Sequence, residues 1–212
     1  MDEQSKHLET LTEIRSLMER SSRFISLSGL SGVFAGVFAL IGAAAAYKYL
    51  DLSLTSQEYY KYATNENGEV NMHFYTFIFT DAIGVLVASL AVGIILTTRK
   101  AKKKDQPIWD ATAKRLLVNI LIPLVAGGLF CLVLLYHGLV AFMAPATLLF
   151  YGLSLLNASK YTLNDIRYLG ICEIILGLIA SVYLGYGLLF WAVGFGLLHI
   201  IYGTVMYYKY EK

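Results

Sequence analysis

The sequence predicts an all-α polytopic transmembrane bundle of six helices. Hydrophobic residues make up 57% of the 212 residues and charged residues only 15%, and the mean hydropathy of +0.59 lies outside the balance of a soluble domain. Several apolar runs reach the roughly 20 residues that a helix needs to cross a ~30 Å hydrocarbon core. These runs are apolar on all sides, whereas strands of a membrane barrel would alternate apolar and polar residues. A spanning helix pairs its backbone groups within itself, so such runs indicate membrane helices.

Six apolar runs define the predicted spans. They cover residues 25–49, 73–97, 115–137, 139–158, 167–185 and 187–208. The third and fourth spans are joined by His137 and Gly138, and the joint between the fifth and sixth contains Gly185 and Gly187. Joints this short predict antiparallel neighbouring helices. Residues 1–24 stand apart as a polar segment ahead of the six-helix domain of residues 25–212.

Basic residues predict the orientation of the bundle. With six spans, every lysine and arginine except Lys48 and Lys61 falls on the side of the two termini. Because basic segments resist translocation, both termini are expected in the cytoplasm, and the chain is expected in the inner (plasma) membrane of the cell. The run RKAKKK at 99–104 is interpreted either as this topology signal alone or as a patch that binds anionic lipid head groups.

The N-terminal segment, residues 1–24, predicts a cytoplasmic amphipathic helix. Apolar residues recur between charged ones at helical spacing, namely Leu8, Leu11, Ile14, Leu17 and Met18. Such a helix can lie on the membrane surface, pair with a second copy of the chain, or dock on a soluble protein. The stripe runs under three heptads, which favours an interfacial lead-in over a coiled coil.

Small residues predict the helix faces that pack closely, because helices in lipid associate where their backbones can approach. In the first span Ser28, Gly32 and Gly36 recur at intervals of four residues. The glycines expected on packing faces are Gly29, Gly32, Gly36, Gly177, Gly196 and Gly203.

Three ionisable residues lie on such small-residue stripes, on three different spans. Glu173 lies one turn from Gly177, His199 lies one turn from Gly203, and Asp81 lies near Gly84. They are therefore expected to face the bundle interior rather than lipid. Counted from the span ends at ~1.5 Å per residue, Glu173 and His199 differ in depth by only a few ångströms, in the inner half of the membrane.

Other polar residues complete two predicted tiers. Asn119 and Asn157 lie nearer the inner surface, below Glu173 and His199. The outer tier holds Asp81, with these residues around its level: His73, Thr76, Thr80 and His137. Pro123 and Pro145 predict kinks in the third and fourth spans, between the tiers.

The buried polar groups have a functional and a structural interpretation. An uncompensated charge at membrane depth costs ~2.5–3.5 kcal/mol or more, so a buried acid indicates a proton or cation relay or a polar ligand pocket. The same groups can instead join helices by hydrogen bonds worth ~0.6 kcal/mol on average. The candidates for binding an ion, a proton or a ligand are Glu173, Asp81, His199, Asn119, Asn157 and His137.

Signatures of other functional classes are missing from the sequence. It has no nucleotide-binding, metalloprotease or serine-hydrolase motif, so an enzyme is not expected. The net charge of +2 gives no indication of a nucleic-acid partner. No metal ion or other cofactor is expected, since Cys131 and Cys172 lack metal-ligand spacing and a haem between His73 and His137 lacks the spacing of a cytochrome.

The segment EIRSLMERSSRFISLSGLSGVFAGVFALIGAAAAY, residues 13–47, resembles a family of small bacterial polytopic membrane proteins. The resemblance is specific to ERSSRFISLSGLSG, residues 19–32. It implies no established activity. Proteins of that family look like neighbours of a winged-helix transcriptional regulator, so the resemblance implies that a soluble regulator can meet the cytoplasmic face.

Two functional hypotheses follow from these observations. The first is a small proton- or cation-linked carrier or channel, in which Glu173 and Asp81 bind protons or cations and His199 assists. The second is a membrane sensor or scaffold that acts through residues 1–24 on a cytoplasmic regulator. The partners left open are the lipid bilayer, a second copy of the chain and that regulator.

Overall fold

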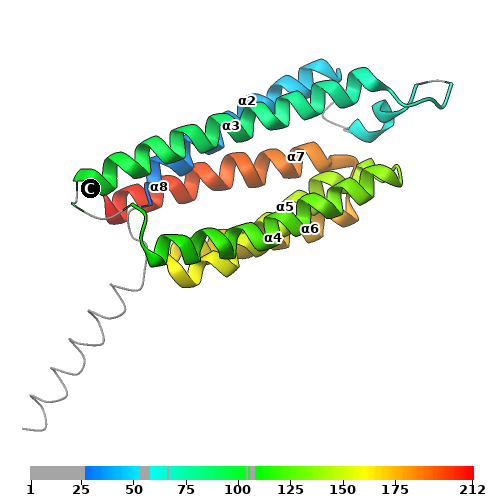
Figure 1. Ribbon diagram of the computed structural model, residues 1–212. Helices are drawn as coiled ribbons and strands as arrows, with labels where there is room; N and C mark the ends of the chain where they lie inside the picture. Colours follow the sequence, from blue (N-terminus) through cyan, green and yellow to red (C-terminus); the bar gives the residue numbers. More distant parts are fainter. Residues whose placement is uncertain (1–26, 53–57, 66, 104, 106–107) are drawn as a thin grey trace, which may run out of the picture.

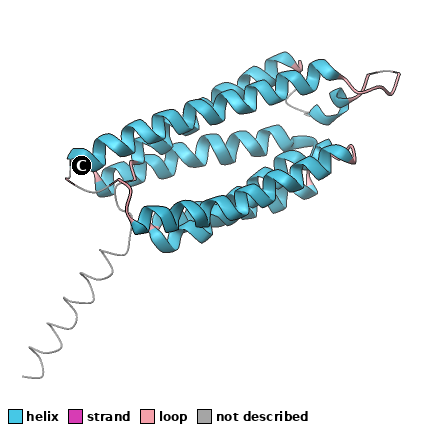
Figure 2. Cartoon of the chain, in the orientation of Figure 1, coloured by secondary structure: helices cyan, strands magenta, loops and turns pink. Residues whose placement is uncertain are grey.

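The computed structural model describes residues 27–52, 58–65, 67–103, 105 and 108–212. In these parts the chain is helical, apart from short joints and an isolated bridge between Thr64 and Val70 (Figure 2). The α-helices are α2 (Gly29–Tyr49), α3 (Met72–Lys103), α4 (Ala111–Tyr136), α5 (Met143–Ala158), α6 (Asp165–Val182), α7 (Gly187–Trp191) and α8 (His199–Tyr210). A π-helix, η5 (Ala192–Leu198), joins α7 to α8. The helix predicted for residues 1–24 lies outside the described residues.

Short 3₁₀-helices occupy the joints of the bundle. They are η1 (Tyr59–Ala63), η2 (Val140–Phe142), η3 (Ser159–Tyr161) and η4 (Leu184–Tyr186). Between α4 and η2, Gly138 adopts a φ of +69°, a left-handed conformation that glycine tolerates without steric cost. The two predicted tight joints are therefore short turns between helices.

Five helical segments are long and apolar enough to cross a membrane. They are Gly29–Tyr49, Met72–Lys103, Ala111–Tyr136, Val140–Tyr161 and Leu184–Tyr210. The all-α prediction is confirmed, and these five segments identify a membrane protein. The remaining predicted span, residues 167–185, corresponds to the 18-residue helix α6, which carries Asp165, Arg167 and Glu173 and is not one of the five.

The helices form two groups that lie side by side (Figure 1). In one group α2 packs between α3 and the continuous α7–η5–α8 segment, and in the other α5 packs between α4 and α6. The groups meet where α5 and α6 contact α7, η5 and α8. Helix direction alternates along the chain, so α2, α4 and α6 begin at the end of the bundle where α3, α5 and α8 finish.

Glycines set the distance between α2 and α8. A Cβ atom on Gly203 would lie 2.6 Å from the Val33 nitrogen and 2.7 Å from the Gly29 carbonyl oxygen. About two turns further along α2, where it packs on η5, a Cβ on Gly36 would lie 2.5 Å from the carbonyl oxygen of Gly196. The two backbones are thus in direct contact, as in membrane helix pairs that associate through small residues.

A second close contact joins α5 to α6. A Cβ on Gly152 would lie 2.7 Å from the Gly170 carbonyl oxygen, and a Cβ on Gly177 would lie 2.9 Å from the Leu149 side chain. This contact fixes the face of α6 that carries Glu173, because Glu173 lies one turn from both Gly170 and Gly177.

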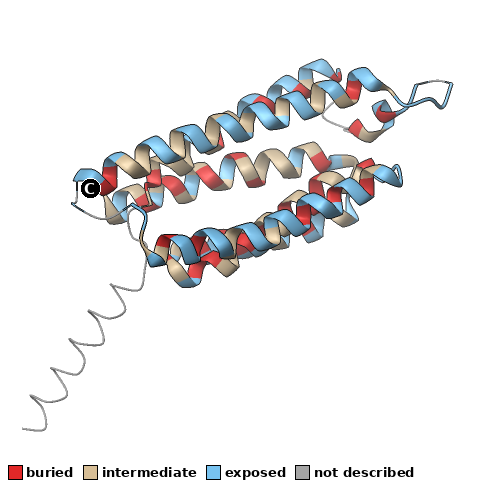
Figure 3. Cartoon of the chain, viewed as in Figure 1, coloured by how far each residue is buried: buried red, intermediate tan, exposed pale blue. Residues whose placement is uncertain are grey.

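Exposed residues occur along the long helices of the bundle (Figure 3). Many of them are large apolar side chains. On α3 the exposed side chains include Ile83, Leu86, Val87, Leu90 and Ile94. An exposed apolar face of this length suits hydrocarbon better than water.

Helix α3 is longer than the predicted span 73–97, because it continues through the basic run to Lys103. Cations are favourable in the last turn of a helix, where they interact with its carbonyl end. Lys100 is nevertheless buried, with its Nζ 2.6 Å from the Leu27 carbonyl oxygen and 3.3 Å from the Glu211 carboxylate. This lysine therefore joins helix ends inside the protein instead of contributing to a lipid-binding patch.

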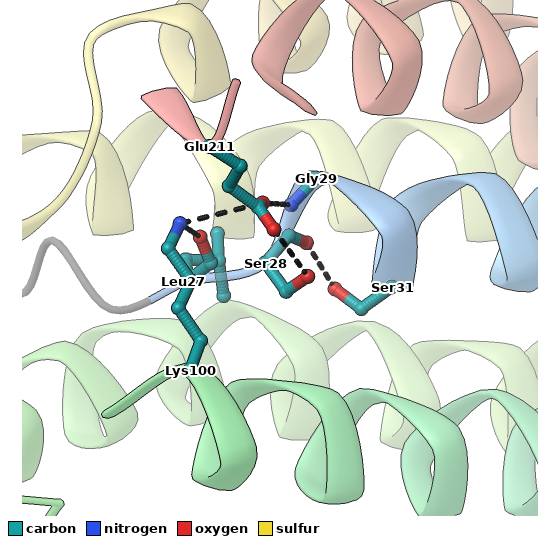
Figure 4. A network of polar contacts seen from close by, with 6 residues as sticks. All are labelled: Leu27, Ser28, Gly29, Ser31, Lys100 and Glu211. Carbon is teal, nitrogen blue, oxygen red and sulfur yellow. Dashed lines mark hydrogen bonds and ion pairs between the residues drawn. The ribbon is translucent and has the colours of Figure 1, made fainter. Parts of the chain in front are cut away.

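Glu211 binds the first turn of α2 (Figure 4). Its carboxylate accepts hydrogen bonds from the backbone N–H of Gly29 and from the hydroxyl of Ser28. An acid is favoured there because the first N–H groups of a helix have no partner within the helix. With Lys100, this network joins α2, α3 and the C-terminal end of α8.

Candidate functional site

Glu173 is fully enclosed between α5, α6 and η5. Its exposed fraction is 0%, and within the described part of the chain neither carboxyl oxygen has a hydrogen-bond partner. The Oε2 atom lies against Gly194, where a Cβ would come within 2.6 Å of it. Leu148 and Leu176 border the same spot. An acid with no hydrogen bond in an apolar enclosure is costly, so the site calls for a second charged or protonatable group.

His199 supplies that group. Its Nδ1 atom lies 3.5 Å from Glu173 Oε1 and 2.9 Å from the carbonyl oxygen of Gly194, and its Nε2 atom lies 2.7 Å from the hydroxyl of Tyr151. In the neutral ring that fits these distances, Nδ1–H donates to Gly194 and the Tyr151 hydroxyl donates to Nε2. Glu173 then lies beside the Nδ1–H group, just beyond hydrogen-bonding distance.

The π-helix positions both partners of Glu173. Segment η5 runs from Ala192 to Leu198 and ends directly before His199. Its wider turn is rare in proteins and occurs frequently at functional sites. Gly194, inside η5, leaves room for the Glu173 carboxyl and offers its carbonyl oxygen to His199.

Aromatic rings surround His199. The Tyr151 and Phe195 ring centroids lie 5.3 Å and 6.0 Å from that of His199. Trp191 continues the row, 5.1 Å from Phe195. Phe195 and Trp191 thus form a row of rings that begins at His199.

Trp191 also lines a cavity of about 180 Å³ between the two helix groups. The cavity walls come from α2, α3, η1, α4, α5 and α7, and most of the lining is apolar or aromatic. Asp81 of α3 is the acidic residue of the lining. Its two carboxyl oxygens lie by Gly42 of α2, where a Cβ would come within 3.1 Å and 3.3 Å of them.

Asp81 has no hydrogen bond or ion pair with any described residue. It is half-buried and lies nine residues from the start of α3, about 14 Å along the helix. Asp81 and Glu173 therefore occupy different places, and Trp191 and Phe195 lie between the cavity and His199.

Tyr59 closes one side of the cavity from outside the spans. Its hydroxyl donates to the carbonyl oxygens of Val140 and Ala141, at 3.1 Å and 3.2 Å. Burial raises the pKa of this phenol well above its usual range. The contact fixes η1 to the joint between α4 and α5.

Asn119 and Asn157 join α4 to α5 and do not contact Glu173. The Asn157 side chain donates to the Asn119 carbonyl oxygen at 2.9 Å, and the Asn119 side chain donates to the Arg115 carbonyl oxygen at 2.8 Å. Pro123 lies four residues after Asn119 and has no N–H to offer that carbonyl. Asn157 thus supplies the hydrogen bond that proline removes, which is a structural role.

Most members of the predicted outer tier do not meet Asp81 inside the bundle. His73, Thr76 and Thr80 are exposed, and His137 is the exposed C-cap residue of α4 and does not line the Asp81 cavity. Gly84, expected to share a packing face with Asp81, has open space around it. The reason is that α3 packs mainly on α2, so only the face with Asp81 and Val85 meets protein.

Pro145 does not kink a helix. It is the third residue of α5, in the first turn, where a missing N–H costs no intrahelical bond. Cys131 and Cys172 are both free, and the Cys172 sulfur lies 3.6 Å from the Tyr202 hydroxyl. Among the described residues no group of three or more His, Cys, Asp and Glu side chains could hold a metal ion.

Three residues of the site went unrecognised in the sequence, namely Tyr151, Gly194 and Trp191. Tyr151 offered a signal, because it lies in the middle of a predicted span, far from the interfaces where the other tyrosines cluster, and a buried hydroxyl needs a partner. Gly194 and Trp191 gave no signal that distinguishes them from packing residues.

The fold and the site define a helical membrane protein with a buried carboxyl–imidazole pair and a separate acidic cavity. No protein-family model, curated protein or solved structure matches the chain. The function is therefore argued from the residues of the site.

Proposed function

We propose that the chain is a multi-pass protein of the bacterial inner membrane with six spans and both termini in the cytoplasm. The distribution of lysine and arginine supports this orientation. Helix α6 is the fifth of the six spans in this proposal, although it carries three charged residues. Its close contact with α5 along Gly152 and Gly170 supports a crossing alongside α5, in the opposite chain direction.

We propose further that the protein is a proton-linked carrier in which Glu173 and His199 bind and release a proton. The proposal rests on one observation, the fully enclosed Glu173 carboxyl without a hydrogen bond, 3.5 Å from His199 Nδ1. With one proton bound, either the acid is neutral beside a neutral imidazole, or a carboxylate faces an imidazolium. Without that proton the pair carries a net negative charge inside the membrane, which is unfavourable.

This charge balance gives a reason for coupling. Release of the proton is favoured when a second cation compensates the charge left behind, and uptake is favoured when that cation leaves. Proton movement and cation movement are thereby linked through one buried site. Asp81 is the second acidic group of the proposed carrier. It lines the cavity, and Trp191 and Phe195 lie between that cavity and His199.

The test is proton flux into vesicles that contain the purified full-length protein. Glu173→Gln keeps the size of the side chain and removes its ability to exchange a proton, so flux is expected to fall to the level of empty vesicles. Glu69→Gln, at an exposed position outside the spans, is the matched control and should keep wild-type flux. Wild-type flux in both Glu173→Gln and Asp81→Asn would exclude the carrier. The sensor hypothesis predicts no flux, and co-purification of a soluble partner that depends on residues 1–24.

A further inference from the structure

The cavity beside Asp81 combines apolar walls with one acid. Its aromatic lining residues are Tyr59, Phe74, Tyr75, Phe79 and Trp191. Aliphatic side chains from α2, α4, α5 and α7 complete the wall. A cavity lined in this way is a favourable place for an apolar ligand, and its few polar groups select which ligand enters.

Asp81 sets the charge of that ligand. It is the acidic lining residue and has no ion pair with a described residue, so its carboxylate can accept a counter-ion from outside the protein. Among the described residues that line the cavity there is no lysine or arginine. Aromatic rings attract cations through their negative faces, more strongly in a desolvated site, and quaternary ammonium ligands are recognised in this way. Acid and rings thus favour the same ligand charge.

The cavity volume sets the size of the ligand. At about 180 Å³ it is close to the ~150 Å³ of an engineered apolar protein cavity that binds benzene. A hydrated metal ion would keep its water and gain nothing from the apolar walls. The fitting ligand is a cation whose charge sits on a compact apolar body.

We propose that this cavity binds a monovalent organic cation about the size of one aromatic ring, with Asp81 as its counter-ion. This proposal names the substrate class of the proposed carrier. Transport of the cation rests on the carrier function, whereas binding of the cation does not. Trp191 contacts both the cavity and, through Phe195, the ring of His199. A bound cation would therefore lie on the route toward the proton-binding pair.

Binding can be measured through the fluorescence of Trp191. The chain has two tryptophans, and Trp109 is 64% exposed in the joint before α4, so a Trp109→Phe variant leaves Trp191 as the reporter. The protein is placed in nanodiscs of zwitterionic lipid and titrated with phenyltrimethylammonium. The neutral isostere tert-butylbenzene is titrated in parallel. Each ligand is compared between the reporter protein and its Asp81→Asn variant, so partition into lipid cancels.

Asp81→Asn is expected to weaken binding of the cation by about tenfold or more, which corresponds to ~1.4 kcal/mol, while binding of the neutral isostere stays within about twofold. Retained isostere binding also shows that the variant is folded. Glu69→Gln should change neither affinity. The proposal is overturned if Asp81→Asn weakens both ligands equally or neither, or if the cavity is found filled by a lipid acyl chain that only the neutral ligand displaces.

The outcome separates binding from transport. Cation binding that depends on Asp81, without any proton flux, would leave the site in place and exclude the carrier. Proton flux that depends on Glu173, without cation binding, would leave the carrier in place and exclude this substrate class.

Discussion

At the scale of single residues, the bundle satisfies a backbone group that its own sequence leaves without a partner. Pro123 cannot donate to the Asn119 carbonyl oxygen, and Asn157 from the neighbouring helix donates to it instead, at 2.9 Å. In lipid no water can replace such a hydrogen bond, so an unpaired carbonyl would destabilise the folded protein.

This pairing gives a prediction that a double-mutant cycle can check. Asn157→Leu should lower the free energy of unfolding by about 1–3 kcal/mol, because it leaves the partly buried Asn119 carbonyl unpaired. In a Pro123→Ala background the loss should shrink, since the alanine N–H pairs with the same carbonyl in the helix. Unfolding in mixed micelles, followed by circular dichroism, measures both steps. An equal loss in the two backgrounds would show that the proline is not the reason for Asn157.

The sequence predicted Glu173 and His199 at a similar depth, and the structure places them side by side, but the sequence could not show which atoms meet. Helical rise places residues along the axis, whereas the distance of 3.5 Å between them also depends on the rotation of α6 against η5. That rotation follows from the contact of Gly152 with Gly170 and from the π-helix. A seven-residue π-helix has no periodicity signal in a sequence analysed with 3.6 residues per turn. Tyr151 offered a signal as a hydroxyl in the middle of a span, but its hydrogen bond to His199 Nε2 depends on the same rotation and could not be assigned.

At the scale of elements, a short helix outside the spans is fixed to the bundle by one phenol. Tyr59 in η1 donates to Val140 and Ala141 at the joint of α4 and α5, and its ring lines the cavity. Burial raises its pKa above the usual value of about 10, so the folded state favours the protonated phenol. The stabilisation from Tyr59 is therefore complete below pH ~10 and is lost as the pH rises above it.

The expected result is a stability difference that shrinks at alkaline pH. At pH 8 Tyr59→Phe should unfold about 1 kcal/mol more easily than the wild type, since it leaves two carbonyl groups without this donor. Above pH ~10, the ordinary pKa of tyrosine, the wild type should lose stability faster than the variant. Thermal unfolding at fixed pH values measures the difference. Tyr136→Phe, at an 87% exposed tyrosine, is the control and should follow the wild type at every pH.

Element existence was easier to predict than element ends and faces. Five apolar runs appear as long apolar helices, because length and composition alone determine them. Helix α3 continues beyond the predicted span 73–97, since the basic residues after 97 extend the helix to Lys103 instead of ending it. Gly84 was expected on the packing face of α3, but it has open space around it. A stripe of small residues in the sequence does not show whether a neighbouring helix is present on that side.

At the scale of the whole molecule, the direction of α6 decides the topology. Its charges are compensated in ways that allow a crossing. Asp165 lies 3.0 Å from Lys209 and accepts a 2.6 Å hydrogen bond from the Tyr210 hydroxyl, at the end of the bundle where α8 finishes. Arg167 is exposed two residues further on, where a long side chain can reach the interface. Glu173 is enclosed by protein.

If α6 crosses the membrane, residues 160 and 183 lie on opposite sides. Single cysteines are introduced by Lys160→Cys, Tyr183→Cys, Asn67→Cys and Lys212→Cys in a chain whose native cysteines are replaced by alanine. A membrane-impermeant maleimide on intact cells should label positions 67 and 183, and should reach 160 and 212 only after the cells are permeabilised. If position 183 is labelled only after the cells are permeabilised, as position 160 is, then α6 does not cross the membrane. The C-terminus would then lie outside, and Lys209 and Lys212 would oppose the basic-residue rule, which is why six spans are the expected answer.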